Sequence, residues 1–230
     1  MTKVSIFIPS FNLGGAEKVS LELLDYLISR GYFCDFLVSS RKGSLLKNLN
    51  SKAHLFELGK GRVINSFFPF LFYIWKNDPD IIISFLTHCN VLSTVAVRLS
   101  NFLFNKNIKI IISERSSIYF TNYVKVSNLQ RILTPFIGAF YNLSDTIITP
   151  SLGIKEELIS VRNIKSNLIE VIPNTLDIDF IHSLSKQEPL FNIDHHKPFV
   201  ISIARLTYQK DFHTLLLAFK YIVFYYNRNI

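Results

Sequence analysis

Short runs of β-branched and aliphatic residues alternate along this chain with longer segments in which apolar residues recur every three or four positions. The short runs are typical of strands, and the longer segments are typical of amphipathic helices. Two of the runs, DIIISF at 80–85 and IKIIIS at 108–113, are apolar on both faces, as central strands of parallel sheets are. We therefore predict an α/β fold built on a doubly wound parallel sheet with helices on both faces.

The pattern predicts eight strands and six helices. The strands are expected at Val4–Pro9, Asp35–Ser39, His54–Leu58, Ile81–Phe85, Lys109–Ser113, Thr146–Thr149, Ile169–Ile172 and Phe199–Ala204. The helices are expected at 16–28, where Gly31 follows as a C-cap, and at 62–77, 90–103, 127–142, 152–160 and 212–226.

A polar segment at 182–198, HSLSKQEPLFNIDHHKP, interrupts this pattern and collects charges and prolines. We place a domain boundary in it. Residues 1–190 are expected to form one α/β domain, and residues 191–230 the incomplete start of a second domain of the same kind. The neighbouring His195 and His196 are expected in a solvated loop, because no further metal ligands lie close in the sequence.

The composition is that of a globular protein, with 49% hydrophobic and 18% charged residues. A net charge of +8 favours anionic partners such as nucleotides, phosphates or a lipid surface; no nucleic-acid partner is expected. Cys34 and Cys89 lie in apolar stretches, which indicates reduced core residues and a cytoplasmic location. No secretory signal or transmembrane helix is predicted, because the longest aromatic run, SFFPFLFYIW at 66–75, is about half as long as a bilayer span.

A glycine loop, PSFNLGGAEK at 9–18, follows the first predicted strand and opens a helix. Gly14 and Gly15 would let the backbone approach an anion at the free N–H groups of the helix start. A plain strand-to-helix turn is the alternative. A dinucleotide site is disfavoured, because the loop reads N-x-G-G rather than G-x-G-x-x-G and Asp35 falls at the start of the second strand, not its end.

Two cations lie between the last predicted strand and the last helix. Arg205 and Lys210 would suit a diphosphate there, together with the helix N-terminus. Each charge-assisted hydrogen bond contributes about 1.5 to 3 kcal/mol. Two solvated surface cations are the alternative.

Polar residues also follow the fourth and fifth predicted strands. His88 and the pair Glu114 and Arg115 are expected at the ligand-binding edge of the sheet. For His88 a satisfied structural histidine stays open as an alternative, and for Glu114 with Arg115 a local ion pair does.

The segment ARLTYQKDFHTLLLAF at 204–219 resembles the donor-binding signature of retaining family 4 glycosyltransferases of the GT-B fold. Three further segments are similar to that family in the same order: GGAEKVSLELLDYLISRGY at 14–32, SDTIITPS at 144–151 and IEVIPNTLDID at 169–179. The resemblance implies that residues 1–190 are the GT-B amino-terminal, acceptor-side Rossmann-like domain. It also implies that residues 191–230 begin a second Rossmann-like, nucleotide-sugar-binding domain.

By this resemblance Arg205 and Lys210 grip the diphosphate of a nucleotide sugar, and Gly14 and Gly15 lie beside it. His88, Glu114 and Arg115 then belong to the acceptor side, and Asn174 lies at the interdomain turn. The family moves a hexose to a saccharide or lipid-linked acceptor with retention, generally without a metal or other cofactor. Positive side chains and helix dipoles stabilise the leaving diphosphate instead.

The sequence departs from the family where an E-x7-E carboxylate pair is usual after the Arg and Lys, since no such pair follows Lys210. We therefore expect a truncated chain that is inactive alone, and a non-catalytic partner subunit remains the alternative. The aromatic run at 66–75, near Arg62 and Lys76, and NFLFNKNIK at 101–109 allow a peripheral contact with the inner membrane face, or are simply core helices.

Overall fold

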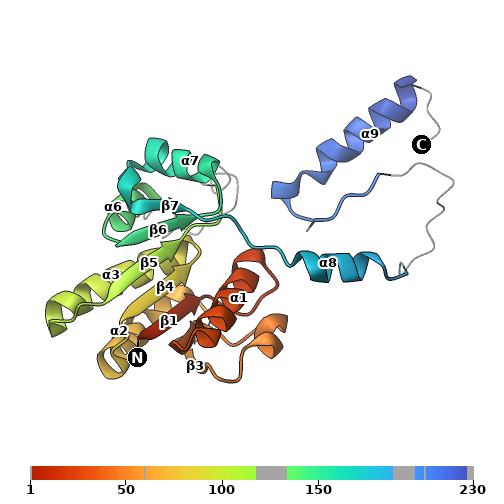
Figure 1. The fold of residues 1–230 in the computed structure, drawn as a ribbon. Coiled ribbons are helices and arrows are strands. Elements are labelled where there is room, and N and C mark those ends of the chain that lie inside the picture. Colours follow the sequence, from red (N-terminus) through yellow and green to blue (C-terminus); the bar gives the residue numbers. More distant parts are fainter. Residues whose placement is uncertain (1, 60, 118–133, 189–199, 205, 227–230) are drawn as a thin grey trace. The chain divides into compact units, whose positions relative to one another are not determined.

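The computed structural model describes residues 2–59, 61–117, 134–188, 200–204 and 206–226 (Figure 1). The chain divides into two compact units, Met1–Thr175 and Leu176–Ile230. Whether the functional domains meet near residue 190 stays a prediction.

The described residues of the first unit form seven parallel strands in one sheet, ordered β3-β2-β1-β4-β5-β6-β7 (Figure 1). The strands are β1 (Lys3–Ile8), β2 (Phe33–Val38), β3 (His54–Glu57), β4 (Ile81–Phe85), β5 (Lys109–Ser113), β6 (Thr146–Thr149) and β7 (Ile169–Val171). Each lies within two residues of a predicted strand. The expected Rossmann-like α/β fold is thereby confirmed.

Five helices and four 3-10 turns of the first unit lie within the described residues. The helices are α1 (Gly15–Ser29), α2 (Phe67–Asn77), α3 (Thr87–Phe104), α6 (Ile137–Tyr141) and α7 (Leu152–Arg162). The turns are η1 (Ser44–Asn48), η2 (Val63–Ser66), η3 (Thr134–Phe136) and η4 (Ser166–Leu168). Most of the predicted helix at 127–142 lies outside the described residues. No helix in the described part of the chain combines the length and apolarity that crossing a membrane requires.

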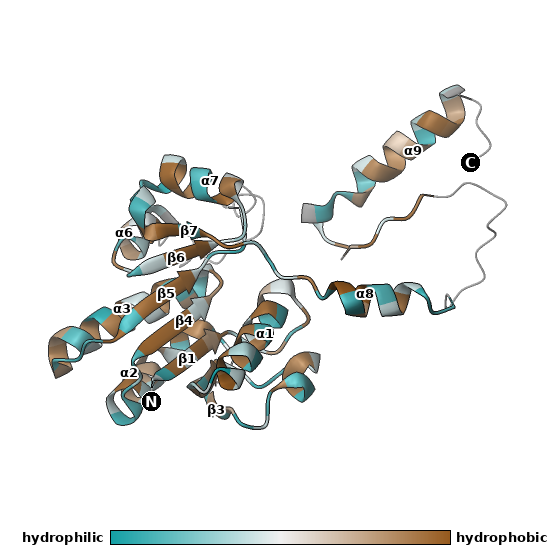
Figure 2. Cartoon of the chain, viewed as in Figure 1, coloured by the Kyte–Doolittle hydropathy of each residue, from teal (hydrophilic) through white to brown (hydrophobic). Residues whose placement is uncertain are grey.

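The sheet buries its two faces in separate clusters of apolar residues. In β5, Ile110 and Ile112 belong to the cluster under α2, α3 and α7, whereas Ile111 packs against the cluster under α1. Burying one such side chain stabilises the fold by about 1.5 to 3 kcal/mol. Figure 2 shows the corresponding hydrophobic colouring along the central strands. The apolar runs of the sequence are therefore explained by burial on both faces.

Both cysteines lie in these cores as free thiols, as the sequence predicts. Burial raises the pKa of each: at Cys34 the neighbouring Asp35 carboxylate adds to the effect, and at Cys89 the Glu17 carboxylate does. Neither thiol is a ready nucleophile.

The second unit contains α8 (Ile178–Ser185), η5 (Tyr208–Lys210) and α9 (Phe212–Tyr226) in its described part. The helix at 212–226 is confirmed. The strand prediction at Phe199–Ala204 is wrong for its described part, because residues 200–204 form no strand. A parallel strand needs hydrogen-bonded neighbours, and no other strand is found among the described residues of this unit. Helix α8 was not predicted; its second half lies in the polar segment 182–198, in which no helix was expected.

Candidate functional site

The strand order reverses between β1 and β4. The chain leaves β1 for β2 on one side and leaves β4 for β5 on the other. Open α/β sheets bind ligands outside the carboxyl ends of the strands at such a switch point. The two loops that meet there carry Gly14 with Gly15, and His88. The topology therefore brings these predicted site residues to one edge of the sheet.

The glycine loop after β1 is held in place by the segment after β2. The Phe11 amide donates to the Lys42 carbonyl (2.8 Å), and the Leu45 amide donates to the Phe11 carbonyl (3.0 Å). Gly43, at φ 129°, lies so close that a Cβ there would stand 2.0 Å from the Phe11 carbonyl carbon. The close approach of the Phe11 backbone and the positive φ thus require a glycine at position 43. The sequence analysis did not identify Gly43.

Gly14 and Gly15 have different surroundings. A Cβ at Gly14 would lie 2.2 Å from the Glu17 Oε2, so the Glu17 carboxylate lies over this residue. A Cβ at Gly15 would meet no atom within 4 Å. Packing against the described residues therefore does not require a glycine at position 15. The space beside Gly15 is open to a ligand. Glu17 is also the charge that acts on Cys89 in α3, so its carboxylate lies near the start of that helix.

Leu86 links β4 to α3 in an unusual backbone conformation, with φ 73° and ψ 139°. The other non-glycine residues described with positive φ are Asp or Asn, for which it is less costly. Such strain, of about 1 to 3 kcal/mol, is concentrated at functional sites. His88 follows in the first turn of α3; its side chain is exposed, yet surrounding protein atoms desolvate it and lower its pKa. A neutral imidazole is therefore present near neutral pH.

Glu114 is 1% exposed at the end of β5. One carboxylate oxygen accepts from the Arg115 amide (3.0 Å) and the Ser116 amide (3.1 Å). The other accepts from the Thr87 hydroxyl (2.9 Å) and the Tyr141 hydroxyl (2.5 Å). Burial raises the pKa of this carboxyl, while the hydrogen bonds oppose the rise. Both oxygens of this carboxyl group are therefore hydrogen-bonded within the protein. They connect Thr87, at the start of α3, to the residues that follow β5.

Tyr141 forms several hydrogen bonds in the same buried network. Its hydroxyl also accepts from the Asn90 amide nitrogen (3.2 Å), which in turn donates to the Ser113 carbonyl (3.0 Å). Burial and the Glu114 carboxylate raise the pKa of the Tyr141 hydroxyl, so it remains a proton donor. Because Tyr141 is distant in sequence and lies in a short helix, no sequence signal pointed to it.

Arg115 lies beside Asn174, as predicted for residues of one site. Its guanidinium donates to the Asn174 Oδ1 and, through Nε, to the Ser113 hydroxyl (2.8 Å). It also stands 5.5 Å from the Phe85 ring centre, and burial lowers its pKa. An ion pair with Glu114 is not among those formed by the described residues, so the alternative of a local pair is not supported.

The segment after β7 runs along this edge. Asn174 accepts a hydrogen bond from Arg115, which follows β5 in the sequence. The hydroxyl of the next residue, Thr175, donates to the Glu22 carboxylate of α1 (3.2 Å). In Figure 1 this segment leaves β7 and passes toward α1. It therefore contacts the loop after β5 and the helix that follows β1.

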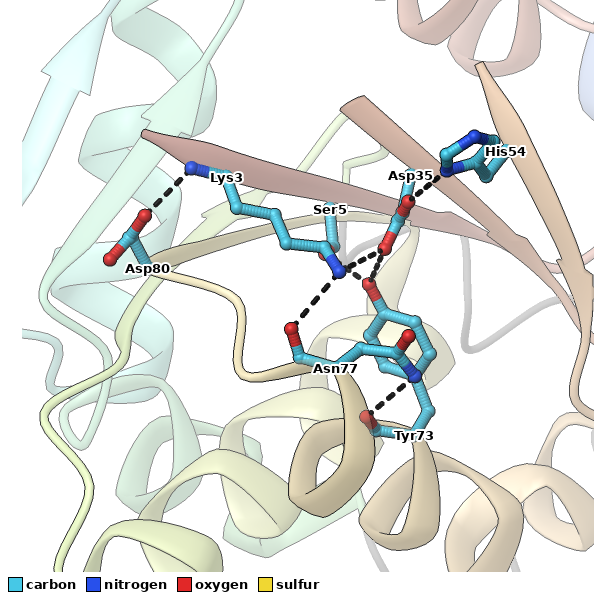
Figure 3. A network of polar contacts seen from close by, with 7 residues as sticks. All are labelled: Lys3, Ser5, Asp35, His54, Tyr73, Asn77 and Asp80. Carbon is cyan, nitrogen blue, oxygen red and sulfur yellow. Dashed lines mark hydrogen bonds and ion pairs between the residues drawn. The ribbon is translucent and has the colours of Figure 1, made fainter. Parts of the chain in front are cut away.

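Asp35 lies at the opposite, amino-terminal edge of the sheet (Figure 3). Its buried carboxylate contacts the Lys3 ammonium (3.0 Å), the His54 Nδ1 (3.5 Å) and the Tyr73 hydroxyl. The Lys3 ammonium also donates to the Asn77 carbonyl (3.0 Å). This carboxylate is engaged within the protein, away from the glycine loop, so it cannot serve as the ribose-binding acid of a dinucleotide site.

The second unit carries the predicted diphosphate cations. Lys210 is exposed in η5, and Arg205 lies outside the described residues. Asp211, between them and α9, accepts from the Thr214 amide (3.2 Å). Hydrogen bonds from the Thr214 side chain, and secondly from its amide, lower the pKa of Asp211. Part of the α9 N-terminus is thereby occupied by a carboxylate. The diphosphate site remains a prediction.

Metal ligands do not cluster within the described residues, where no three His, Cys, Asp or Glu side chains come together. His195 and His196 lie outside that part of the chain.

A family model described as Glycosyltransferase Family 4 matches residues 13–180. This match covers most of the chain and contains the loops of the switch point, from Gly14 to Asn174. The chain belongs to glycosyltransferase family 4. Arg205 and Lys210 lie beyond the matched residues of this family 4 chain.

Solved structures of GT-B glycosyltransferases share the fold of this family 4 chain. A glycosyltransferase from Rickettsia africae has a TM-score of 0.55 at 18% identity, over 82% of this chain and 46% of that one. HepE of Anabaena in complex with UDP-glucose has a TM-score of 0.59 at 14% identity, over 78% and 45%. The sucrose-phosphate synthase of Thermosynechococcus elongatus has a TM-score of 0.55 at 14% identity, over 78% and 49%. The chain thus spans about half the length of these proteins. None of the curated proteins matches it.

Proposed function

We propose that this chain is the acceptor-side part of a retaining glycosyltransferase. The enzyme moves a hexose from a nucleoside diphosphate sugar to a saccharide or lipid-linked acceptor. The observation that carries the proposal is the family 4 match over residues 13–180, which includes the switch-point loops. HepE of Anabaena was crystallised with UDP-glucose, which supports a nucleotide sugar as the donor.

Each residue has a proposed role. Gly14 and Gly15 admit the donor phosphates to the start of α1, and Arg205 with Lys210 binds the departing diphosphate. His88, Arg115 and Asn174 line the acceptor side. Glu114 is buried and fully hydrogen-bonded, so we assign it a positioning role: it holds Thr87 and the Arg115 amide in place. Cations and helix dipoles take the place of a metal.

Residues 1–190 would supply the acceptor side and residues 191–230 the beginning of the donor side. Acting alone, the 230 residues are proposed not to catalyse transfer. This is supported by the solved relatives, of which the chain covers 46% and 45%. The proposed location is cytoplasmic, with peripheral contact at the inner membrane face where lipid-linked acceptors are found.

A transfer assay tests the function. Radiolabelled nucleoside diphosphate hexoses would be offered with lipid-linked and free saccharide acceptors, and the anomeric configuration of any product would be determined by NMR. The purified chain should give no product, and product with a retained configuration should form once a polypeptide containing the rest of a donor domain is added. Turnover by the chain alone would refute the proposed dependence, and an inverted product would refute retention.

A non-catalytic partner subunit is the second candidate. Apolar side chains of the second unit are exposed, including Ile203, Leu216 and Phe224. Such surface is normally covered by another element or chain. If the chain is a partner, it should raise the UDP affinity of a full-length glycosyltransferase in calorimetric titrations without forming product of its own.

A further inference from the structure

Helix α2 is apolar on two faces, and the core uses only one of them. Phe70, Tyr73 and Ile74 are buried against the sheet and α3. On the outer face Phe68, Phe72 and Trp75 are 78%, 59% and 57% exposed. Their spacing of four and three residues places them along one side of the helix. Packing within the protein therefore explains the first set and leaves the second unexplained.

The end of α3 continues this exposed apolar surface. Phe102 is 85% exposed, and Leu103 and Phe104 are also exposed. The two helices pack against each other. An ion pair between Lys106 and Asp78 joins the residues that follow each helix, so both helix ends lie at the same end of the molecule. We call Phe68, Phe72, Trp75, Phe102, Leu103 and Phe104 the aromatic surface.

Basic residues border the aromatic surface. Lys76 follows Trp75 directly, and Lys109 begins β5 just after α3; both are exposed. Neither forms an ion pair with any described residue. Of the neighbouring acids, Asp78 is paired with Lys106 and Asp80 accepts from the Lys3 amide. Lys76, Lys106 and Lys109 together outnumber the carboxylates of Asp78 and Asp80, so the local charge is positive.

We propose that the aromatic surface is the part of the chain that rests on an anionic lipid bilayer. Phenylalanine and tryptophan side chains enter the interface between headgroups and acyl chains, while adjacent lysines attract anionic headgroups. A second copy of the chain would equally cover apolar area, but the unpaired lysines favour a negatively charged occupant. The inference deepens the proposed function and rests on it: the contact would hold the protein at a bilayer that contains lipid-linked acceptors.

The single tryptophan of the chain makes the test specific to this surface. Emission from Trp75 would be followed while the full chain is titrated with phosphatidylcholine vesicles containing phosphatidylglycerol. The emission should shift to the blue and be quenched by brominated acyl chains, and the protein should sediment with the vesicles. Binding to vesicles of pure phosphatidylcholine should be weaker by about tenfold or more.

Variants separate the aromatic and basic contributions. Phe68→Ser with Phe72→Ser should weaken vesicle binding about tenfold or more, and Lys76→Glu with Lys109→Glu should remove the preference for phosphatidylglycerol. Tyr26→Ser is the matched control, because Tyr26 is also exposed but lies on α1, at the other face of the sheet. If the double phenylalanine variant unfolds by circular dichroism, Phe68→Ser alone provides the comparison.

The inference would be overturned by the absence of a blue shift with anionic vesicles, or by an equal loss of binding in Tyr26→Ser. A concentration-dependent blue shift without vesicles would also overturn it, in favour of a second copy of the chain. Vesicle binding without any sugar transfer would contradict only the proposed function. Transfer to soluble acceptors without vesicle binding would contradict only the lipid contact.

Discussion

The Glu114 carboxylate connects two loops of the candidate site. It accepts hydrogen bonds from Thr87, just before His88, and from the Arg115 and Ser116 amides. A buried carboxylate is tolerated only when donors surround it, because desolvation of an unpaired charge costs several kcal/mol. The sequence predicted Glu114 at this edge of the sheet. Its burial could not be predicted, because it depends on Tyr141, a residue far along the chain.

Removing the Tyr141 hydroxyl tests this arrangement. Tyr141→Phe deletes one donor to the Glu114 carboxylate and the acceptor of the Asn90 amide. We expect the free energy of unfolding to fall by about 1 to 3 kcal/mol, the cost of leaving buried polar groups without a partner. Urea denaturation measures it, with the exposed Tyr26→Phe as control. A loss no larger than that of the control would show that the network is not formed.

Glu114 also predicts a pH dependence of stability. Burial raises its pKa above the ordinary 4.5, so above that pH the folded protein binds more protons than the unfolded chain. Its contribution to stability is therefore complete below the unfolded-state pKa and is lost as the pH rises through the folded-state pKa. Glu114→Gln removes this titration. The stability of the variant relative to wild type should therefore increase with pH across that window in urea unfolding series. A constant difference would mean that the carboxyl titrates at its ordinary pKa.

Among the elements, the loop after β1 depends on a glycine that lies after β2. Gly43→Ala introduces a Cβ into the Phe11 carbonyl at positive φ, and we expect a loss of about 1 to 3 kcal/mol or more in the free energy of unfolding. Gly15→Ala is the matched control, because its Cβ meets no described atom within 4 Å. It should unfold like wild type and lose donor binding instead. A larger stability loss in Gly15→Ala than in Gly43→Ala would contradict this assignment.

The central strands, which the sequence predicted with the correct bounds, are buried on both faces. Strands such as β4 and β5 are continuous apolar runs because helices cover both faces, and their bounds match the prediction. The region at 200–204 has the same composition but forms no strand, since strand formation depends on neighbours that the sequence does not specify locally. Helix α8 was missed because it has only eight residues and its second half lies in the polar segment 182–198. At the site, glycine and charge patterns identified the loops, whereas Leu86, Glu17 and Gly43 are recognisable only from backbone angles and close approaches.

At the scale of the whole molecule, the apolar clusters that the described residues bury lie within the first unit, between Val4 and Ile169. A fragment of residues 1–175 is therefore predicted to unfold cooperatively, with the same thermal midpoint as the full chain within a few degrees. Differential scanning calorimetry on both proteins checks it. A fragment without a cooperative transition would show that the second unit contributes to the core.

The proposed function requires that a nucleoside diphosphate sugar contact both the glycine turn and the cations near α9. Hydrogen–deuterium exchange of the full chain, mixed with a polypeptide that contains the rest of a donor domain, with and without each of the common nucleoside diphosphate hexoses, tests this most directly. For the correct donor we predict slower exchange of the amides at 9–17 and at 206–214, and loss of this protection in Lys210→Ala. Unchanged exchange in both segments with every donor, or protection confined to the Asp35 edge of the sheet, would contradict the account.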